Sequence, residues 1–90
     1  MKYSIFRTNS FKKAYKKLTQ KDKEKVIFIV EKLANGEDLE KKYKDHSLIG
    51  NFKDCRECHV KPDLLLIYKI DNNEVQLMLV ELGNHSSLFG

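Results

Sequence analysis

The pattern of hydrophobic and polar positions begins with a strand followed by an amphipathic helix. Residues 2–6, "KYSIF", alternate weakly and are rich in β-forming side chains, which indicates a strand. "TNS" then has the composition of a helix cap. In the next segment the apolar residues recur with helical spacing and lysines occupy the opposite side; the apolar set is Phe11, Ala14, Tyr15 and Leu18.

A second helix is predicted directly after the first. Residues 19–22, "TQKD", resemble a capping box that opens a helix. Phe28 falls outside the apolar face of this helix, and Asn35-Gly36 is typical of a helix end. The apolar face should contain Val26, Ile27, Ile29, Val30, Leu33 and Ala34.

The rest of the chain predicts three strands. Residues 37–49 form a charged connection, and strands are expected at 51–60, 64–70 and 75–82. Pro62-Asp63 separates the first two, and Asp71-Asn72-Asn73 predicts a tight hairpin between the last two. The order β-α-α-β-β-β predicts an α+β fold, in which a helical hairpin packs on one face of a mostly antiparallel sheet. We expect all 90 residues to form one domain.

Charge divides the chain into two unequal halves. Residues 1–44 carry 13 Lys or Arg against 6 Asp or Glu, whereas residues 45–90 carry 4 against 7. A lysine-rich half suits a polyanionic partner such as RNA, or an acidic protein, although a solvated helix surface would have the same composition. No secretory signal or apolar run long enough for a membrane span is recognisable, so we expect a cytoplasmic protein without a membrane partner.

The stretch "DCRECHVKPD", residues 54–63, contains both cysteines in a C-x-x-C-H pattern. This spacing is the one used for attachment of c-type haem, and the same residues with other histidines could form a zinc site. Haem attachment normally follows export, for which the chain has no signal. Cys55 and Cys58 would also diverge on a regular strand. We therefore predict that the cysteines pack in the interior and that no metal or cofactor is needed.

The histidines are the stronger chemical candidates. His59 and Asp63 flank a turn, and His85 follows the last strand, so hairpin topology can bring these three to one end of the sheet. His46 lies on a connection whose path the pattern does not predict. Imidazoles beside a carboxylate suit acid–base chemistry near neutral pH, such as RNA cleavage through the ribose 2′-hydroxyl. The alternative is that the three histidines are ordinary surface or capping residues.

Several ordered motifs in the second half resemble one known family. These are "DHSL" at 45–48, "RECHVKPDLLLIY" at 56–68 and "GNHSSLF" at 83–89. Over residues 40–90 they are similar to the YafQ branch of the RelE-like bacterial toxins, while residues 1–36 agree only in their strand-helix-helix layout.

The resemblance implies a ribosome-dependent mRNA endonuclease, the toxin of a type II toxin–antitoxin pair. It also implies a cognate antitoxin, of ribbon-helix-helix type, as a partner beside mRNA and the ribosome. Carried over by motif, the catalytic residues would be His46, His59, Asp63 and His85. Residues expected to bind RNA are Phe89, Arg56, Lys53 and Lys61.

Two positions depart from the family pattern. Leu64 stands where this branch often has tryptophan, and Glu81 stands where it commonly has an arginine that would stabilise the phosphorane. Arg56 or Lys61 could substitute, although Arg56 has the opposite strand parity to His59. An alternative is therefore a RelE-fold module that binds antitoxin or ribosome and cleaves weakly or not at all. A metal-binding Cys/His protein is the third possibility.

Overall fold

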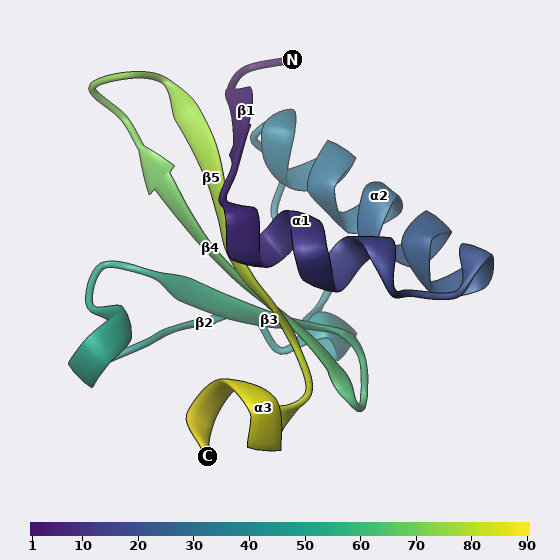
Figure 1. Cartoon of the computed structure of the whole chain (residues 1–90). Helices are drawn as coiled ribbons and strands as arrows, with labels where there is room; N and C mark the ends of the chain where they lie inside the picture. Colours follow the sequence, from purple (N-terminus) through teal and green to yellow (C-terminus); the bar gives the residue numbers. More distant parts are fainter.

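A five-stranded sheet forms the centre of the computed structural model, which describes residues 1–90 (Figure 1). The strand order is β1-β5-β4-β3-β2. The strands are β1 (Ser4–Arg7), β2 (His46–Ser47), β3 (Arg56–Lys61), β4 (Leu64–Asp71) and β5 (Gln76–Gly83). The helices are α1 (Asn9–Lys16), α2 (Gln20–Ala34) and α3 (His85–Phe89), with 3₁₀ turns η1 (Lys41–Tyr43) and η2 (Gly50–Phe52). The expected α+β order is confirmed, with β2 and α3 added to it.

The sheet is mixed, because β1 joins it in parallel with β5. The other three pairings, β2 with β3, β3 with β4 and β4 with β5, are antiparallel. A parallel neighbour requires the chain to cross back over the sheet, and the helical hairpin is part of that crossing. The prediction of a mostly antiparallel sheet with a helical hairpin is therefore confirmed.

Side-chain caps begin both helices of the hairpin, as the sequence predicts. Thr8 accepts a 3.0 Å hydrogen bond from the Phe11 amide, and Thr19 accepts one of 3.2 Å from the Asp22 amide. At the end of α2, Gly36 has a φ of +78°, a left-handed conformation that glycine adopts without steric cost.

Two local expectations are wrong. The strand expected at 51–60 begins only at Arg56, because left-handed residues at Gly50 (φ +80°) and Asp54 (φ +69°) turn the preceding segment. The pattern predicts Ile27 on the buried face of α2, but Ile27 is 44% exposed and lines a surface pocket together with Tyr15 of α1.

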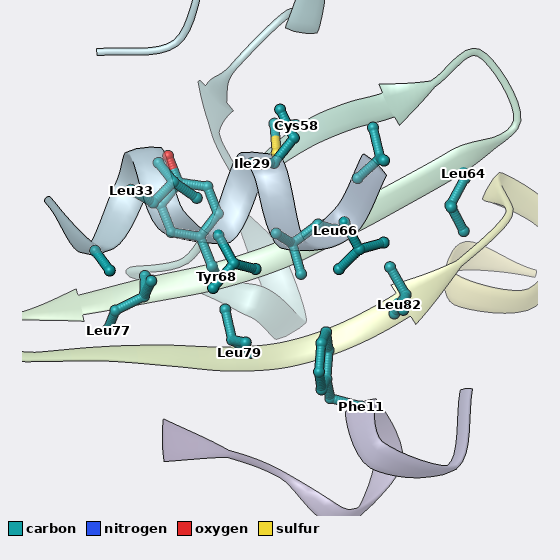
Figure 2. Close-up of a cluster of buried hydrophobic side chains, with 14 of the residues drawn as sticks. Phe11, Ile29, Leu33, Cys58, Leu64, Leu66, Tyr68, Leu77, Leu79 and Leu82 are labelled. Carbon is teal, nitrogen blue, oxygen red and sulfur yellow. The ribbon is translucent and has the colours of Figure 1, made fainter. Parts of the chain in front are cut away.

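The main core lies between the sheet and the two long helices (Figure 2). Phe11 of α1 and Ile29 and Leu33 of α2 contribute side chains from the helical layer. The sheet contributes alternate residues of its central strands, since these share a face, with one three-residue step in β5 where the register shifts. The labelled sheet residues in Figure 2 are Cys58, Leu64, Leu66, Tyr68, Leu77, Leu79 and Leu82.

The opposite face of the sheet is also partly buried, and α3 lies against it. Leu65 and Ile67 are almost fully buried, yet neither belongs to the core under α1 and α2. A Cβ atom on Gly83 would lie 2.6 Å from the Ser87 hydroxyl, so only glycine lets α3 fold this closely onto the end of β5. Figure 1 shows α3 on the other side of the strands from α1 and α2. None of the helices is long and apolar enough to cross a membrane.

Candidate active site

A row of paired residues across four strands organises the face that carries the histidines. His46 of β2 pairs with Glu57 of β3, Glu57 pairs with Ile67 of β4, and Ile67 pairs with Glu81 of β5. Residues directly opposite each other on adjacent strands project to the same side of a sheet. The row therefore places two carboxylates and one histidine on the face away from the helical hairpin.

Glu57 holds two histidines at once. One of its carboxylate oxygens lies 3.5 Å from Nε2 of His46 and 3.7 Å from Nε2 of His59. Glu57 is only 5% exposed and is the one buried charged residue of the chain. A buried carboxylate needs a charged or hydrogen-bonding partner, and a protonated imidazole supplies one. The sequence prediction missed Glu57. Its one signal was strand alternation, which places Glu57 on the same face as His59.

The His46 ring is fixed from its second nitrogen as well. Nδ1 lies 2.7 Å from the backbone carbonyl oxygen of Lys44. A carbonyl only accepts hydrogen bonds, so Nδ1 carries the proton and Nε2 faces Glu57. Lys44 can present this carbonyl because it ends η1 in a left-handed conformation, with a φ of +50°. When His46 takes up a second proton, Nε2 becomes a donor directed at the carboxylate.

Asp45, directly before His46, anchors the segment to the sheet from the helical side. Its carboxylate accepts a 2.7 Å hydrogen bond from the Tyr68 hydroxyl and bonds of 3.2 and 3.4 Å from Arg56. Burial and the bond to Asp45 raise the pKa of Tyr68, so its hydroxyl stays protonated and keeps donating. The hydrogen bond to Asp45 raises the pKa of Arg56 as well. Arg56, expected to bind RNA, is thus engaged in this anchor.

His85 is placed by the short helix α3, which has its own cap. Asn84 accepts a 2.7 Å hydrogen bond from the Ser87 amide, and His85 is the first residue of the helix. The His85 ring lies 5.0 Å from that of Phe89, which in turn meets Phe52 of η2 edge-on at 5.8 Å. Both His85 and Phe89 are exposed, so their faces are accessible to a ligand. The sequence analysis placed His85 after the last strand and did not predict this helix.

Asp63 lies in the turn between β3 and β4, where its side chain is 80% exposed. Its nearest charged partner is Lys61, at 3.8 Å. Lys61 itself is held at 3.0 Å by Asp22 of α2, and the hydrogen bond to Asp22 raises the pKa of its ammonium group. Lys61 is therefore engaged by an ion pair with α2, whereas Lys53 is exposed beside η2 and forms no ion pair.

The strand register brings His59, the turn with Asp63 and the end of β5 that leads to His85 to one end of the sheet, as hairpin topology predicts. His59 of β3 pairs with Leu65 of β4, and Leu65 pairs with Gly83 at the end of β5. One strand therefore lies between His59 and Gly83, and His85 follows Gly83 by two residues. Adjacent strands are about 4.8 Å apart, which places His59 and Gly83 roughly 10 Å from each other. No hydrogen bond or ion pair joins the His46–Glu57–His59 group to His85.

Both cysteines are free thiols, buried in different surroundings. Cys58 is completely buried in the main core beneath α2, and burial raises the pKa of its thiol to about 12. Cys55 lies just before β3, outside that core, and burial raises its pKa too. No group of three or more His, Cys, Asp or Glu side chains is arranged to hold a metal ion.

Histidines and carboxylates on one face of a small α+β sheet are groups suited to acid–base chemistry. Comparison with known proteins identifies the family. The family model described as "Bacterial toxin of type II toxin-antitoxin system, YafQ" matches residues 3–90, and the chain belongs to this family.

Individual relatives agree with this membership. The chain is 39% identical over 71 residues to the mRNA interferase toxin YafQ of Escherichia coli K12, covering 78% of this chain and 75% of the relative. It is 42% identical to a metal-bound toxin from Helicobacter pylori, with a TM-score of 0.82 and coverage of 97% and 99% of the two chains. The E. coli DinJ-YafQ complex contains a chain that is 32% identical, with a TM-score of 0.82 and coverage of 98% and 99%.

Proposed function

We propose that this protein is a type II toxin that acts in the cytoplasm as an mRNA interferase on ribosome-bound mRNA, with the whole chain as one domain. The observation that carries the proposal is the pair of histidines turned toward Glu57, near the end of β5 that leads to His85. Membership of the YafQ family supports it, together with the name of the E. coli relative, an mRNA interferase toxin.

The reaction proposed is attack of a ribose 2′-oxygen on the adjacent phosphorus. Asp63 or His59 removes the 2′-hydroxyl proton while the new O2′–P bond forms. The P–O5′ bond then breaks, and His85 delivers a proton to the departing 5′-oxygen. The products are a 2′,3′-cyclic phosphate and a free 5′-hydroxyl, so no oxidant, reductant or metal enters the balance.

Charge on the phosphorane needs cations, and few are free on this face. Arg56 forms an ion pair with Asp45, and Lys61 forms one with Asp22. Neither side chain is therefore free to take the role of the arginine that the family commonly has at position 81. Protonated His46, held by Glu57, is the best-placed positive group, and Lys53 is exposed near Phe52. The exposed ring of Phe89 offers a surface on which an mRNA base can stack.

A His85→Ala variant tests the nuclease. Expression of the native chain should arrest growth and produce cuts within translated codons, mapped by primer extension, and His85→Ala should abolish both. Ser86→Ala, at the exposed neighbouring position, is the matched control and should behave as the native chain does. Equal toxicity of native and His85→Ala chains would contradict the catalytic proposal.

The second candidate is a module of the same fold that binds antitoxin or ribosome without efficient cleavage. Glu81 favours it, because this carboxylate shares a cross-strand row with Glu57 on the proposed phosphate-binding face. If the protein is such a binding module, the Glu81→Arg variant should cleave mRNA that the native chain does not cleave. Efficient cutting by the native chain would exclude it.

An antitoxin partner is part of both candidates. The E. coli relative is found in a complex with DinJ. Co-expression of this chain with the protein encoded by the adjacent open reading frame should restore growth. Co-purification of the two would identify the complex.

A further inference from the structure

A lysine-lined groove lies beside the site, at the outer edge of β3. It has a volume of about 660 Å³ and is bordered by α2 on one wall, by η1 with the following residue on another, and by the end of β3. The groove exists because β2 is only two residues long and pairs only with Arg56 and Glu57 of β3. His59 also lines this groove, so the groove and the histidine site share this residue.

The charge of the groove is strongly positive. Lys21 and Lys25 come from α2, and Lys42 and Lys44 come from the η1 segment on the opposite wall. All four are exposed and none forms an ion pair, whereas Glu24 is the only acidic residue in the lining. Four unpaired ammonium groups on two facing walls are costly to bring together unless a polyanion neutralises them.

Aromatic rings are interspersed with these lysines. Phe28 of α2 is 49% exposed and lines the groove, as does the half-buried ring of Tyr43. Phe28 has no role in the core, and the Lys32 ammonium lies 5.3 Å from the centre of its ring. Lysines that contact phosphates, interleaved with rings on which bases stack, are the features by which proteins bind single-stranded nucleic acid without sequence preference.

We propose that this groove binds a single-stranded RNA segment continuing from the phosphate held at His59, with its phosphates along the lysines and bases against Phe28 and Tyr43. The proposal rests on the proposed nuclease function, since it extends the path of the same substrate. Single-stranded RNA is favoured over an acidic peptide because the lysines and rings of the groove are interspersed, as phosphates and bases are along a nucleic-acid strand.

Binding of a non-cleavable probe tests the groove separately from catalysis. The probe is a fluorescein-labelled 12-nucleotide 2′-O-methyl oligoribonucleotide, whose affinity for the full chain is measured by fluorescence anisotropy at several salt concentrations. Because this probe cannot react, a failure of the nuclease proposal would leave the binding result interpretable. Correct folding of each variant is checked by its circular dichroism spectrum and thermal midpoint.

The decisive variant removes one lysine from each wall, Lys25→Ala with Lys42→Ala. The matched control, Lys13→Ala with Lys17→Ala, removes the same charge from exposed positions of α1 outside the groove. The groove variant should bind the probe about tenfold more weakly, with a salt slope smaller by roughly 1.4, while the control changes little. Equal weakening by both variants would overturn the proposal, since net charge alone would then explain binding.

Phe28→Ala tests stacking without changing charge. It should weaken binding of the normal probe severalfold and leave an abasic probe of equal length unaffected. An equal effect on the two probes would overturn the stacking role. If the groove variant left RNA binding intact but weakened binding of a polyglutamate peptide, the groove would belong to an acidic protein and the RNA assignment would be wrong.

Discussion

The Tyr68 hydroxyl donates a 2.7 Å hydrogen bond to Asp45, the residue directly before His46. This bond joins the centre of the sheet to the segment that carries a candidate catalytic histidine. Tyr68 is buried in the main core, so the position of Asp45 is set by the same packing that stabilises the fold. Arg56 completes the anchor from β3. The aspartate of "DHSL" and the arginine and final tyrosine of the second motif thus meet in one hydrogen-bonded group.

Removing that bond should loosen the His46 segment. We expect Tyr68→Phe to lower the free energy of unfolding by about 1 kcal/mol in urea titrations, because Asp45 loses a neutral donor while Arg56 remains. The cleavage rate should fall by more than the loss of folded protein accounts for, because the segment that carries His46 is no longer hydrogen-bonded to Tyr68. Tyr15→Phe, at a half-buried tyrosine whose hydroxyl forms no hydrogen bond, is the control and should change neither quantity. Identical behaviour of the two variants would show that the anchor is dispensable.

The two carboxylates of the cross-strand row should have opposite effects on cleavage. Glu57→Gln keeps the side-chain volume but removes the charge that holds His46 and His59, so cleavage should fall about 10- to 100-fold. Glu81→Gln removes a negative charge from the proposed phosphate-binding face and should increase cleavage. A ribosome programmed with a defined mRNA gives both rates. A fall in both variants, or a rise in both, would contradict these assignments.

The cysteines should be inert in the folded protein and should make it less stable in alkali. Since the pKa of Cys58 is raised to about 12, the unfolded chain releases this proton at a lower pH than the folded chain does. The contribution of the protonated Cys58 thiol to the free energy of unfolding is complete below about pH 9 and declines as pH rises from there toward 12. Urea titrations at pH 7 and pH 10 should show the loss, and Cys58→Ala should reduce it. Rapid modification of both thiols by a disulfide reagent at pH 7 without denaturant would refute the burial argument.

Thr8 should be more important for stability than the other helix-capping threonine. Its hydroxyl caps α1 and also donates a 2.7 Å hydrogen bond to the Val80 carbonyl of β5. Thr8→Ala should therefore cost about 1–2 kcal/mol, whereas Thr19→Ala, which removes an exposed cap only, should cost about 0.5–1 kcal/mol. Denaturant unfolding of both variants measures the difference. A larger loss at Thr19 would show that the link to β5 contributes nothing.

The helical hairpin and the central strand could be predicted from the sequence, because both depend on patterns among residues that are close along the chain. Apolar spacing, the two threonine caps and the Asn35-Gly36 ending define the helical hairpin, and the run at 64–70 defines the central strand. Such signals depend on neighbours within a turn of helix or a strand repeat, so they are readable without knowledge of distant contacts. The ordered motifs around the histidines were likewise sufficient to recognise the family.

Which side chains of β5 share a face depends on tertiary contacts. Leu79 and Glu81 are two residues apart and would lie on one face of a regular strand, but an irregularity at Val80 places Leu79 in the core and Glu81 in the row with Glu57. The short strand β2 and the helix α3 also depend on partners remote in sequence, Glu57 for one and Gly83 for the other. Pairing register and close packing are set by long-range contacts, which is why the role of Glu57 became visible only in the folded chain.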